Sequence, residues 1–288
     1  MDAMKSEHPV TELADALEVS ASGFADHAMK EHRPRREQDR RLGQVLCEVF
    51  HQNRRVYGVP RLRRALRARG WAVGKNRIAR LQRQLGLHPQ QKRRWRTCTT
   101  RVDPGLPAAD NWLAKVPAPD APNQVWVADI TYIPTREGWL YLAAIMDLFS
   151  RTIVGWNTGA DLATPLVTKA WDKACQRRRP APGLLHHSDR GCQYASGAFQ
   201  ALLGNCGAAA SMSRKGNCYD NAAMESFWAT LKTECFGSVI ASTRQQSKLM
   251  VFDYIESFYN RSRLHSSLDY QSPLAFESHF FHPFNPTP

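Results

Sequence analysis

The sequence predicts an α/β core with a mixed β-sheet, preceded by an all-α region that contains a helix-turn-helix. Two observations support this prediction. Apolar residues recur at helical spacing in the first 88 residues, whereas strand-like runs of β-branched and aromatic residues alternate with helical segments from residue 123 onward. A stretch rich in basic residues and proline separates the two patterns. We therefore expect a helical region over residues 1–88, a linker over 89–122, a core over 123–280 and a tail over 281–288.

The helical region divides at glycine and proline residues. Pro60 suits the first turn of a helix, and Gly70 suits the position just after one. The last helix of the region is expected to turn Ile78, Leu81 and Leu85 inward. We expect one short helix within residues 10–30 and further helices over residues 38–52, 61–69 and 75–85, of which the last two form the helix-turn-helix.

The core reads as a meander of three strands followed by alternating helices and strands. This order predicts a mixed sheet, because the first three strands are antiparallel and later strands return through helices. The expected strands are residues 124–133, 139–146, 153–156, 184–187 and 208–212, and the expected helices are residues 163–178, 196–203, 221–236 and 244–259.

The charge of the chain predicts a polyanionic partner. The net charge is +13 at pH 7, and residues 33–101 alone hold 21 basic and 3 acidic side chains. We expect the partner to be double-stranded DNA, with residues 75–85 as the helix nearest to it. The alternative is a small helix bundle with an ordinary solvated basic surface. The candidate phosphate contacts are the outward basic residues of this helix and those at the start of the linker: Lys75, Arg77, Arg80, Arg83, Arg93, Arg94 and Arg96.

Several protein classes are excluded by composition. No apolar run approaches the roughly 18 residues of a membrane span, and no signal peptide is visible. The seven cysteines are scattered and include no CxxC pair, so we expect neither a disulfide framework nor a structural zinc site. We therefore expect a cytosolic protein with reduced thiols and no membrane partner.

Three acidic residues stand out because each breaks its local pattern or ends a strand. Asp129 lies inside an otherwise apolar strand, where an unpaired carboxylate is costly. Asp189 follows the strand over residues 184–187, at the strand end where ligands gather in α/β sheets. Glu225 projects from a helix face different from the apolar stripe, and Lys232 lies two turns further along the same face.

Each acidic residue also has an interpretation without function. Asp129 can be a solvent-facing residue near a strand end, Asp189 can close an Asx turn, and Glu225 can be an exposed glutamate that favours the helix N-terminus. If the three instead converge, their oxygen atoms suit Mg²⁺, and two such ions would serve an in-line displacement at phosphorus.

Longer motifs carry a resemblance to a known family. VWVADITYIPTREGWLYLAAIMDLFSRTIVGW, HHSDRGCQYAS, SRKGNCYDNAAMESFWATLKTE and YNRSRLHSSLDYQSP resemble the second-reading-frame transposases of the insertion-sequence-three type. The spacing of Asp129, Asp189 and Glu225 resembles the DDE motif of retroviral-integrase-like recombinases. YGVPRLRRALRARGWAVGKNRIARLQRQLGL resembles the helix-turn-helix region that precedes the core in that family.

The resemblance implies a ribonuclease-H-like core with Mg²⁺, or Mn²⁺ as substitute, held by Asp129, Asp189 and Glu225. It implies DNA cleavage and strand transfer by a DNA 3′-hydroxyl at insertion-sequence ends, with Lys232 as the basic residue beside the site. It further implies a homo-oligomer on element ends and target DNA in the bacterial cytosol or nucleoid. Members of the family often cooperate with, or are fused to, an upstream DNA-binding reading-frame product.

The sequence departs from the family pattern at Cys192 and Asp269, where serine and glycine are expected. Two other functions stay open beside strand transfer. One is a nuclease that cleaves without joining, and the other is a DNA-binding regulator with no catalytic activity. Four further polar residues inside the family-like motifs are interpreted as structural or supporting: Asp147, His187, Asp220 and Asn221.

Overall fold

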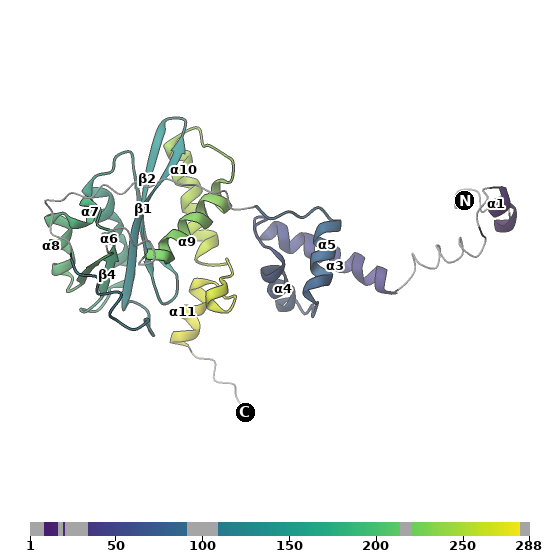
Figure 1. Ribbon diagram of the computed structural model, residues 1–288, viewed down its shortest axis with the longest axis horizontal. Helices are drawn as coiled ribbons and strands as arrows, with labels where there is room; N and C mark the ends of the chain where they lie inside the picture. Colours follow the sequence, from purple (N-terminus) through teal and green to yellow (C-terminus); the bar gives the residue numbers. More distant parts are fainter. Residues whose placement is uncertain (1–8, 17–19, 21–33, 91–108, 214–220, 283–288) are drawn as a thin grey trace, which may run out of the picture. The chain divides into compact units, whose positions relative to one another are not determined.

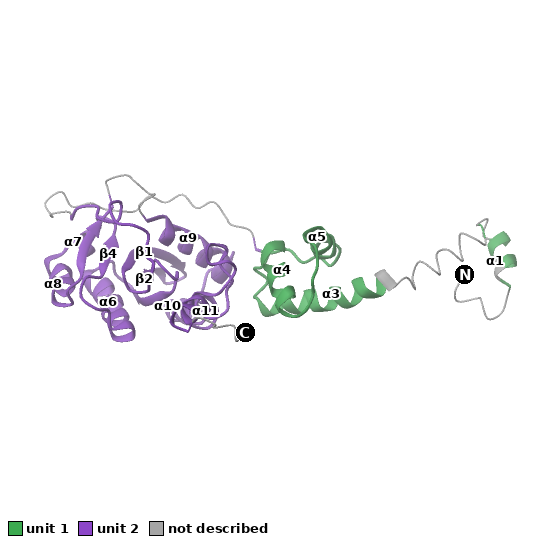
Figure 2. Cartoon of the chain, turned by 90° about the horizontal axis from the view of Figure 1, so that it is seen from below, with its two compact units in different colours: residues 1–89 green, residues 90–288 purple. Residues whose placement is uncertain are grey.

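The computed structural model describes residues 9–16, 20, 34–90, 109–213 and 221–282. The chain divides into two compact units, residues 1–89 and residues 90–288 (Figure 2). Among the described residues, no helix has both the length and the apolar character needed to cross a membrane.

Unit 1 is helical. Its helices are α1 (Val10–Ala16), α3 (Pro34–Gln52), α4 (Val59–Ala68) and α5 (Lys75–Gln84). The last three pack around leucines that are fully buried, among them Leu46, Leu62 and Leu66, together with Ile78. Their amphipathic spacing therefore buries one face of each helix, as the sequence predicts.

One predicted core residue of this unit is only partly covered. Leu85 faces α3, where its Cδ1 atom lies 3.5 Å from the position that a Cβ atom on Gly43 would take, but it is 42% exposed. Helix α5 ends at Gln84, one residue before the predicted end, and Gly86 adopts a positive φ of 63°. Leu87, beyond this glycine, is buried.

Unit 2 contains a five-stranded mixed sheet in the order β3-β2-β1-β4-β5. Strands β1, β2 and β3 form an antiparallel meander, whereas β4 pairs in parallel with both β1 and β5. This is the mixed arrangement that the sequence predicts. The strands are β1 (Val125–Thr135), β2 (Gly138–Asp147), β3 (Ile153–Gly159), β4 (Leu185–Ser188) and β5 (Ala209–Met212).

Helices cover both faces of the sheet (Figure 1). On one face lie α6 (Thr164–Arg178), α7 (Cys192–Ala195) and α8 (Gly197–Asn205), whose side chains form a core with alternate residues of β1 such as Trp126 and Ala128. Helix α6 comes so close to β3 that a Cβ atom on Gly155 would lie 2.3 Å from the carbonyl oxygen of Ala170. Only glycine allows this approach.

The opposite face carries the C-terminal part of the core. It comprises α9 (Ala222–Leu231), the π-helical turn η3 (Lys232–Phe236), α10 (Arg244–Phe252), the π-helical turn η4 (Asp253–Tyr259), the 3₁₀ turn η5 (Ser266–Leu268) and α11 (Pro273–Phe281). The two helices predicted over residues 221–236 and 244–259 each end in a π-helical turn. Helix α11 is missing from the prediction, although Ser272 caps it through Ala275 N and Pro273 starts it.

Candidate active site

Asp129 lies in the middle of β1, on the face that α9 covers. Successive strand residues point to opposite faces, so Asp129 faces away from the core that contains Ala128. Its Oδ1 accepts a hydrogen bond from the Ile130 backbone N–H at 2.7 Å, and its Oδ2 accepts one from the Trp228 indole at 2.8 Å. Asp129 is thus partly exposed, and both of its carboxyl oxygen atoms accept hydrogen bonds from the protein.

Burial raises the pKa of Asp129 to about 7, and the negative charge of Asp189 adds to the rise. The hydrogen bonds from Trp228 and Ile130 oppose it, and the charge of Glu225 contributes a smaller increase. Asp129 is therefore a carboxyl group whose charge is disfavoured by its surroundings and would be favoured by a nearby cation.

Asp189 comes directly after β4, beside β1. Val127 pairs with His187 in the parallel register, so Asp129 and Asp189, each two residues further along, lie at the same level of adjacent strands. The Oδ1 atom of Asp189 accepts a hydrogen bond from Gly191 N at 3.0 Å, which closes an Asx turn. Asp189 thus forms the Asx turn that the sequence suggests as its structural role. Its negative charge also acts on Asp129.

Glu225 lies exposed in the first turn of α9. The helix is tied to β1 on both sides of this residue. The side-chain amide of Asn221 donates to the carbonyl oxygen of Ala128 at 3.1 Å, and Trp228 donates to Asp129. Asn221 occupies the N-cap position of α9, but its side chain bonds to Ala128 of β1 and makes no capping bond, which is a structural contact.

Lys232 begins the π-helical turn after α9 and is partly buried. Burial lowers the pKa of Lys232, and the negative charge of Asp129 opposes that change. Tyr194 of α7 is a further neighbour: burial raises the pKa of its hydroxyl well above the usual range, and the charges of Asp129 and Asp189 add to the rise.

The structure therefore gathers the charges of Asp189, Glu225 and Lys232 around Asp129. The side chains are not arranged as a complete set of metal ligands, since no group of three His, Cys, Asp or Glu side chains within the described ranges could hold a metal ion. The donor chemistry nevertheless suits a divalent cation, because the acidic groups offer only oxygen atoms and Asp129 is a desolvated carboxyl beside another negative charge.

The residues predicted to contact DNA differ in whether their side chains form ion pairs within unit 1. Lys75 and Arg83 are exposed on α5. Arg77 and Arg80 both bind Asp39 of α3, at 2.7 Å and 2.5 Å, so part of their charge is compensated within unit 1. Three others lie outside the described residues: Arg93, Arg94 and Arg96.

Two of the residues interpreted as structural have clear structural partners. Asp147 is fully buried at the turn between β2 and β3, where it accepts hydrogen bonds from the backbone N–H groups of Asn123 and Phe149. The ring of His187 lies between the hydroxyl groups of Ser211 and Ser213 on and after β5. Asp220 lies outside the described residues.

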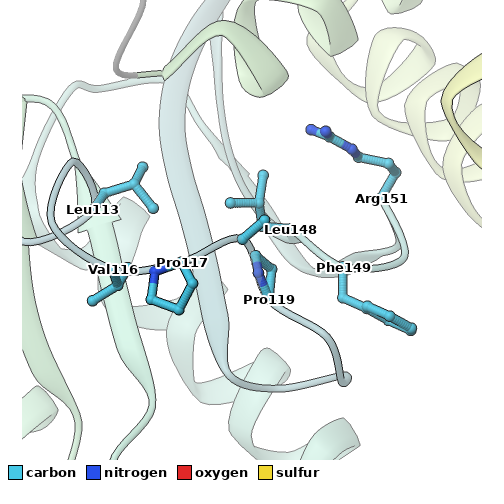
Figure 3. A pocket seen from close by; sticks show the side chains of 8 residues that line it. Leu113, Val116, Pro117, Pro119, Leu148, Phe149 and Arg151 are labelled. Atoms are coloured by element: carbon cyan, nitrogen blue, oxygen red, sulfur yellow. The ribbon is translucent and has the colours of Figure 1, made fainter.

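A pocket of about 320 Å³ lies elsewhere on unit 2 (Figure 3). It is lined by Leu113, Val116, Pro117, Ala118, Pro119, Leu148, Phe149 and Arg151. Most of its lining residues are of apolar types, and none of the three predicted acidic residues lines it. The pocket is therefore not part of the acidic site around Asp129.

Comparison with protein families matches both units. Models described as Integrase core domain match residues 119–218 and 207–273, and a model described as HTH-like domain matches residues 37–95. Together with the mixed sheet and the helical unit 1, these matches confirm the predicted fold class.

Similar proteins match over most of the chain. The insertion element IS600 uncharacterized 31 kDa protein of Shigella sonnei is 44% identical over 93% of this chain and 98% of its own length. The transposase for insertion sequence element IS904 of Lactococcus lactis is 41% identical over 86% of this chain and 98% of its own. The transposase InsF for insertion sequence IS3A of Escherichia coli is 36% identical over 95% and 96%.

Comparison with solved structures matches a simian T-cell lymphotropic virus intasome in complex with PP2A regulatory subunit B56 gamma, with a TM-score of 0.47 and 14% identity over 78% of this chain and 72% of that one. Another is the HTLV-2 integrase catalytic core domain in complex with magnesium, with a TM-score of 0.42 and 13% identity over 55% and 98%.

Proposed function

Because the chain belongs to the IS3 family of insertion-sequence transposases and has an integrase core, we propose that it transposes DNA by metal-dependent cleavage and strand transfer at element ends. The observation that carries this proposal is the hydrogen-bonded carboxyl group of Asp129, around which Asp189, Glu225 and Lys232 contribute charge. An acidic cluster of this kind suits the transfer of a phosphodiester, in which the protein supplies positioning and charge compensation.

Asp129, Asp189 and Glu225 would hold Mg²⁺, with Mn²⁺ as substitute. When bound, such ions lower the pKa of an attacking oxygen and stabilise the charge of the leaving oxygen. The residues of the chain have separate tasks. Asp129 and Asp189 provide anionic oxygen atoms from adjacent strands, Glu225 adds one from α9, and Lys232 faces the same site with a positive charge that suits a DNA phosphate.

Unit 1 would bind double-stranded DNA through its basic helix. Lys75 and Arg83 are exposed and would contact phosphates, whereas Arg77 and Arg80 would first have to loosen their bonds to Asp39. We assign DNA binding to residues 1–88 and catalysis to residues 123–280. The linker arginines 93, 94 and 96 would follow the backbone of the same DNA.

The expected assembly is a homo-oligomer that holds element ends and target DNA together in the bacterial cytosol or nucleoid. Cooperation with an upstream DNA-binding reading-frame product, or fusion to it, belongs to the same proposal. Both are tested by comparing strand transfer by this chain alone, by its fusion, and by mixtures of active and inactive protomers.

The central experiment is strand transfer on labelled element-end DNA with Mg²⁺. Asp129→Asn, Asp189→Asn and Glu225→Gln should each reduce cleavage and joining to background while the proteins stay folded. Asp172→Asn on α6, which changes an exposed carboxylate elsewhere in the core, is the matched control and should retain activity. Wild-type activity in any of the three site variants would contradict the assignment.

A nuclease that cleaves without joining would use the same acidic site. The products distinguish the two functions: strand transfer gives joined DNA species longer than the labelled donor, whereas hydrolysis gives only shortened ones. Cleaved DNA without joined product, under conditions in which donor and target are both bound, would favour the nuclease.

A further inference from the structure

Two hydrogen bonds fasten helix α9 to strand β1, and Glu225 lies between them in the sequence. Asn221, four residues before Glu225, donates to the carbonyl oxygen of Ala128 at 3.1 Å. Trp228, three residues after it, donates from its indole nitrogen to Oδ2 of Asp129 at 2.8 Å. The second bond joins the glutamate helix directly to a carboxylate of the candidate site.

The indole of Trp228 has little freedom to leave this position. Trp228 is only 6% exposed, and its ring lies against the ring of Phe227 with a centroid distance of 4.8 Å. Phe227 in turn packs edge-to-face on Tyr259, also at 4.8 Å. Packing on the C-terminal segment therefore holds the N–H group in place rather than leaving it to a mobile surface chain.

The same bond restricts Asp129. Its two oxygen atoms each accept one hydrogen bond, from Ile130 N and from Trp228, so the carboxylate plane is fixed with respect to the strand and to α9. Each oxygen of an ionised carboxylate can accept more than one partner, so a cation can still bind. A fixed carboxylate loses less conformational entropy when it does so.

We propose that Trp228 is a positioning residue of the active site, whose indole N–H orients Asp129 as a cation ligand and sets the position of Glu225 relative to it. This inference rests on the proposed metal-dependent function. Trp228 itself touches neither cation nor DNA in this proposal. Hydrogen-bond partners behind metal ligands typically change metal affinity or activity by about 10- to 100-fold when they are removed.

A purely structural role for Trp228 predicts a different result. If the ring only fills space, then removal of its N–H would change folding stability without changing how the protein responds to metal. The chain offers a matched control in Trp156 of β3, which is 8% exposed and donates from its indole nitrogen to Oε1 of Glu256 at 2.9 Å. This bond has the same chemistry as that of Trp228 and involves no residue of the site.

The experiment compares Trp228→Phe with Trp156→Phe in the full chain. Binding of Mn²⁺ is measured from the electron paramagnetic resonance signal of the free ion, and strand transfer is measured across a range of Mg²⁺ concentrations. Trp228→Phe should weaken Mn²⁺ binding and raise the half-activating Mg²⁺ concentration, each by about 10-fold or more. Activity should recover partly at high Mg²⁺. Trp156→Phe should match the wild type in both measurements.

Equal metal binding and equal Mg²⁺ dependence in wild type and both variants would overturn the inference. A second variant covers the case in which Trp228→Phe does not fold. Replacing Trp228 alone by 3-benzothienylalanine keeps the ring shape and removes only the N–H, and the same loss of Mn²⁺ affinity is expected. Failure of the proposed function gives a separate result, since wild type would then neither bind Mn²⁺ more tightly than Asp129→Asn nor transfer DNA strands.

Discussion

Arg263 forms a two-pronged ion pair with Glu234, from Nε to Oε2 at 2.6 Å and from Nη2 to Oε1 at 2.7 Å, in the interior between η3 and the segment after η4. Both side chains are almost completely buried, and the hydroxyl group of Tyr254 donates to the same glutamate at 2.8 Å. This pair joins the turn that follows α9 to the C-terminal helices. It therefore stabilises the support behind Glu225 and Lys232.

Glu234→Gln should reduce the free energy of unfolding by about 3–5 kcal/mol, because it leaves the guanidinium of Arg263 buried without a counter-charge. Urea denaturation followed by circular dichroism measures the change. Glu37→Gln breaks an exposed pair with Arg40 and Arg41 and should leave stability close to that of the wild type, because solvent screens exposed pairs. Similar losses in the two variants would contradict the importance of the buried pair.

The raised pKa of Asp129 predicts a pH dependence with a defined sign. Without metal, the folded protein keeps this proton up to about pH 7, whereas the unfolded chain releases it near pH 4. Stability should therefore fall as pH rises from about 4 to 7, by up to about 1.4 kcal/mol per pH unit from this group. Asp129→Asn should remove this contribution, and chemical denaturation at several pH values compares the two proteins.

Divalent cations should reverse the effect, because they favour the ionised form of Asp129. The affinity for Mn²⁺ is expected to fall about tenfold for each pH unit below 7 and to level off above it. An affinity that is constant from pH 5 to 8 would show that Asp129 does not bind the ion.

The buried ring of His186 is expected to make folding stability fall as pH decreases, which is opposite to the trend expected from Asp129. Its ring is buried among Trp171, Tyr194 and Phe199, burial lowers its pKa to about 3, and nearby His187 adds to the decrease. Below about pH 6.5 the unfolded chain takes up a proton that the folded protein refuses, so stability falls as pH decreases.

His186→Phe should remove up to about 1.4 kcal/mol of this loss per pH unit between pH 6.5 and 3. Thermal unfolding from pH 7 to pH 4 measures it. The control is the same substitution, histidine to phenylalanine, at exposed His88. If His186→Phe shows the wild-type acid sensitivity, the loss originates in other groups.

The sequence allows the fold to be predicted in most of its parts but not the contacts that complete the site. Spacing and composition identify the five strands because each strand carries its own local signal. They cannot identify the bond between Trp228 and Asp129, since it joins residues that are 99 positions apart and depends on how α9 packs on the sheet. Tyr194 was missed for the same reason. Leu85 shows the local limit, because spacing predicts the side on which a residue lies but not how far the neighbouring helix covers it.

Asp269 offers a test of a departure from the family pattern. It has a positive φ of 46° just after the turn η5, in the left-handed region that glycine adopts most easily. Asp269→Gly should stabilise the protein by about 0.5–1 kcal/mol, and Asp269→Ala should destabilise it, as measured by thermal unfolding. A loss of stability with glycine would show that interactions of the aspartate side chain outweigh its backbone strain.

Substitution of Asp39 is expected to strengthen DNA binding by unit 1. Its carboxylate binds both Arg77 and Arg80 of α5, and hydrogen bonds from these arginines lower its pKa against the effect of burial, so it is charged at neutral pH. Asp39→Asn should release both guanidinium groups toward phosphates. The affinity for double-stranded DNA should rise, and the slope of its logarithm against the logarithm of salt concentration should steepen by up to about 2.

Fluorescence anisotropy across a salt series measures both quantities. The control is Glu37→Gln, which removes one negative charge from the same helix α3 but frees neither arginine of α5. A smaller affinity in Asp39→Asn, with an unchanged salt slope, would mean that Asp39 holds α5 in its binding position and that Arg77 and Arg80 do not contact DNA themselves.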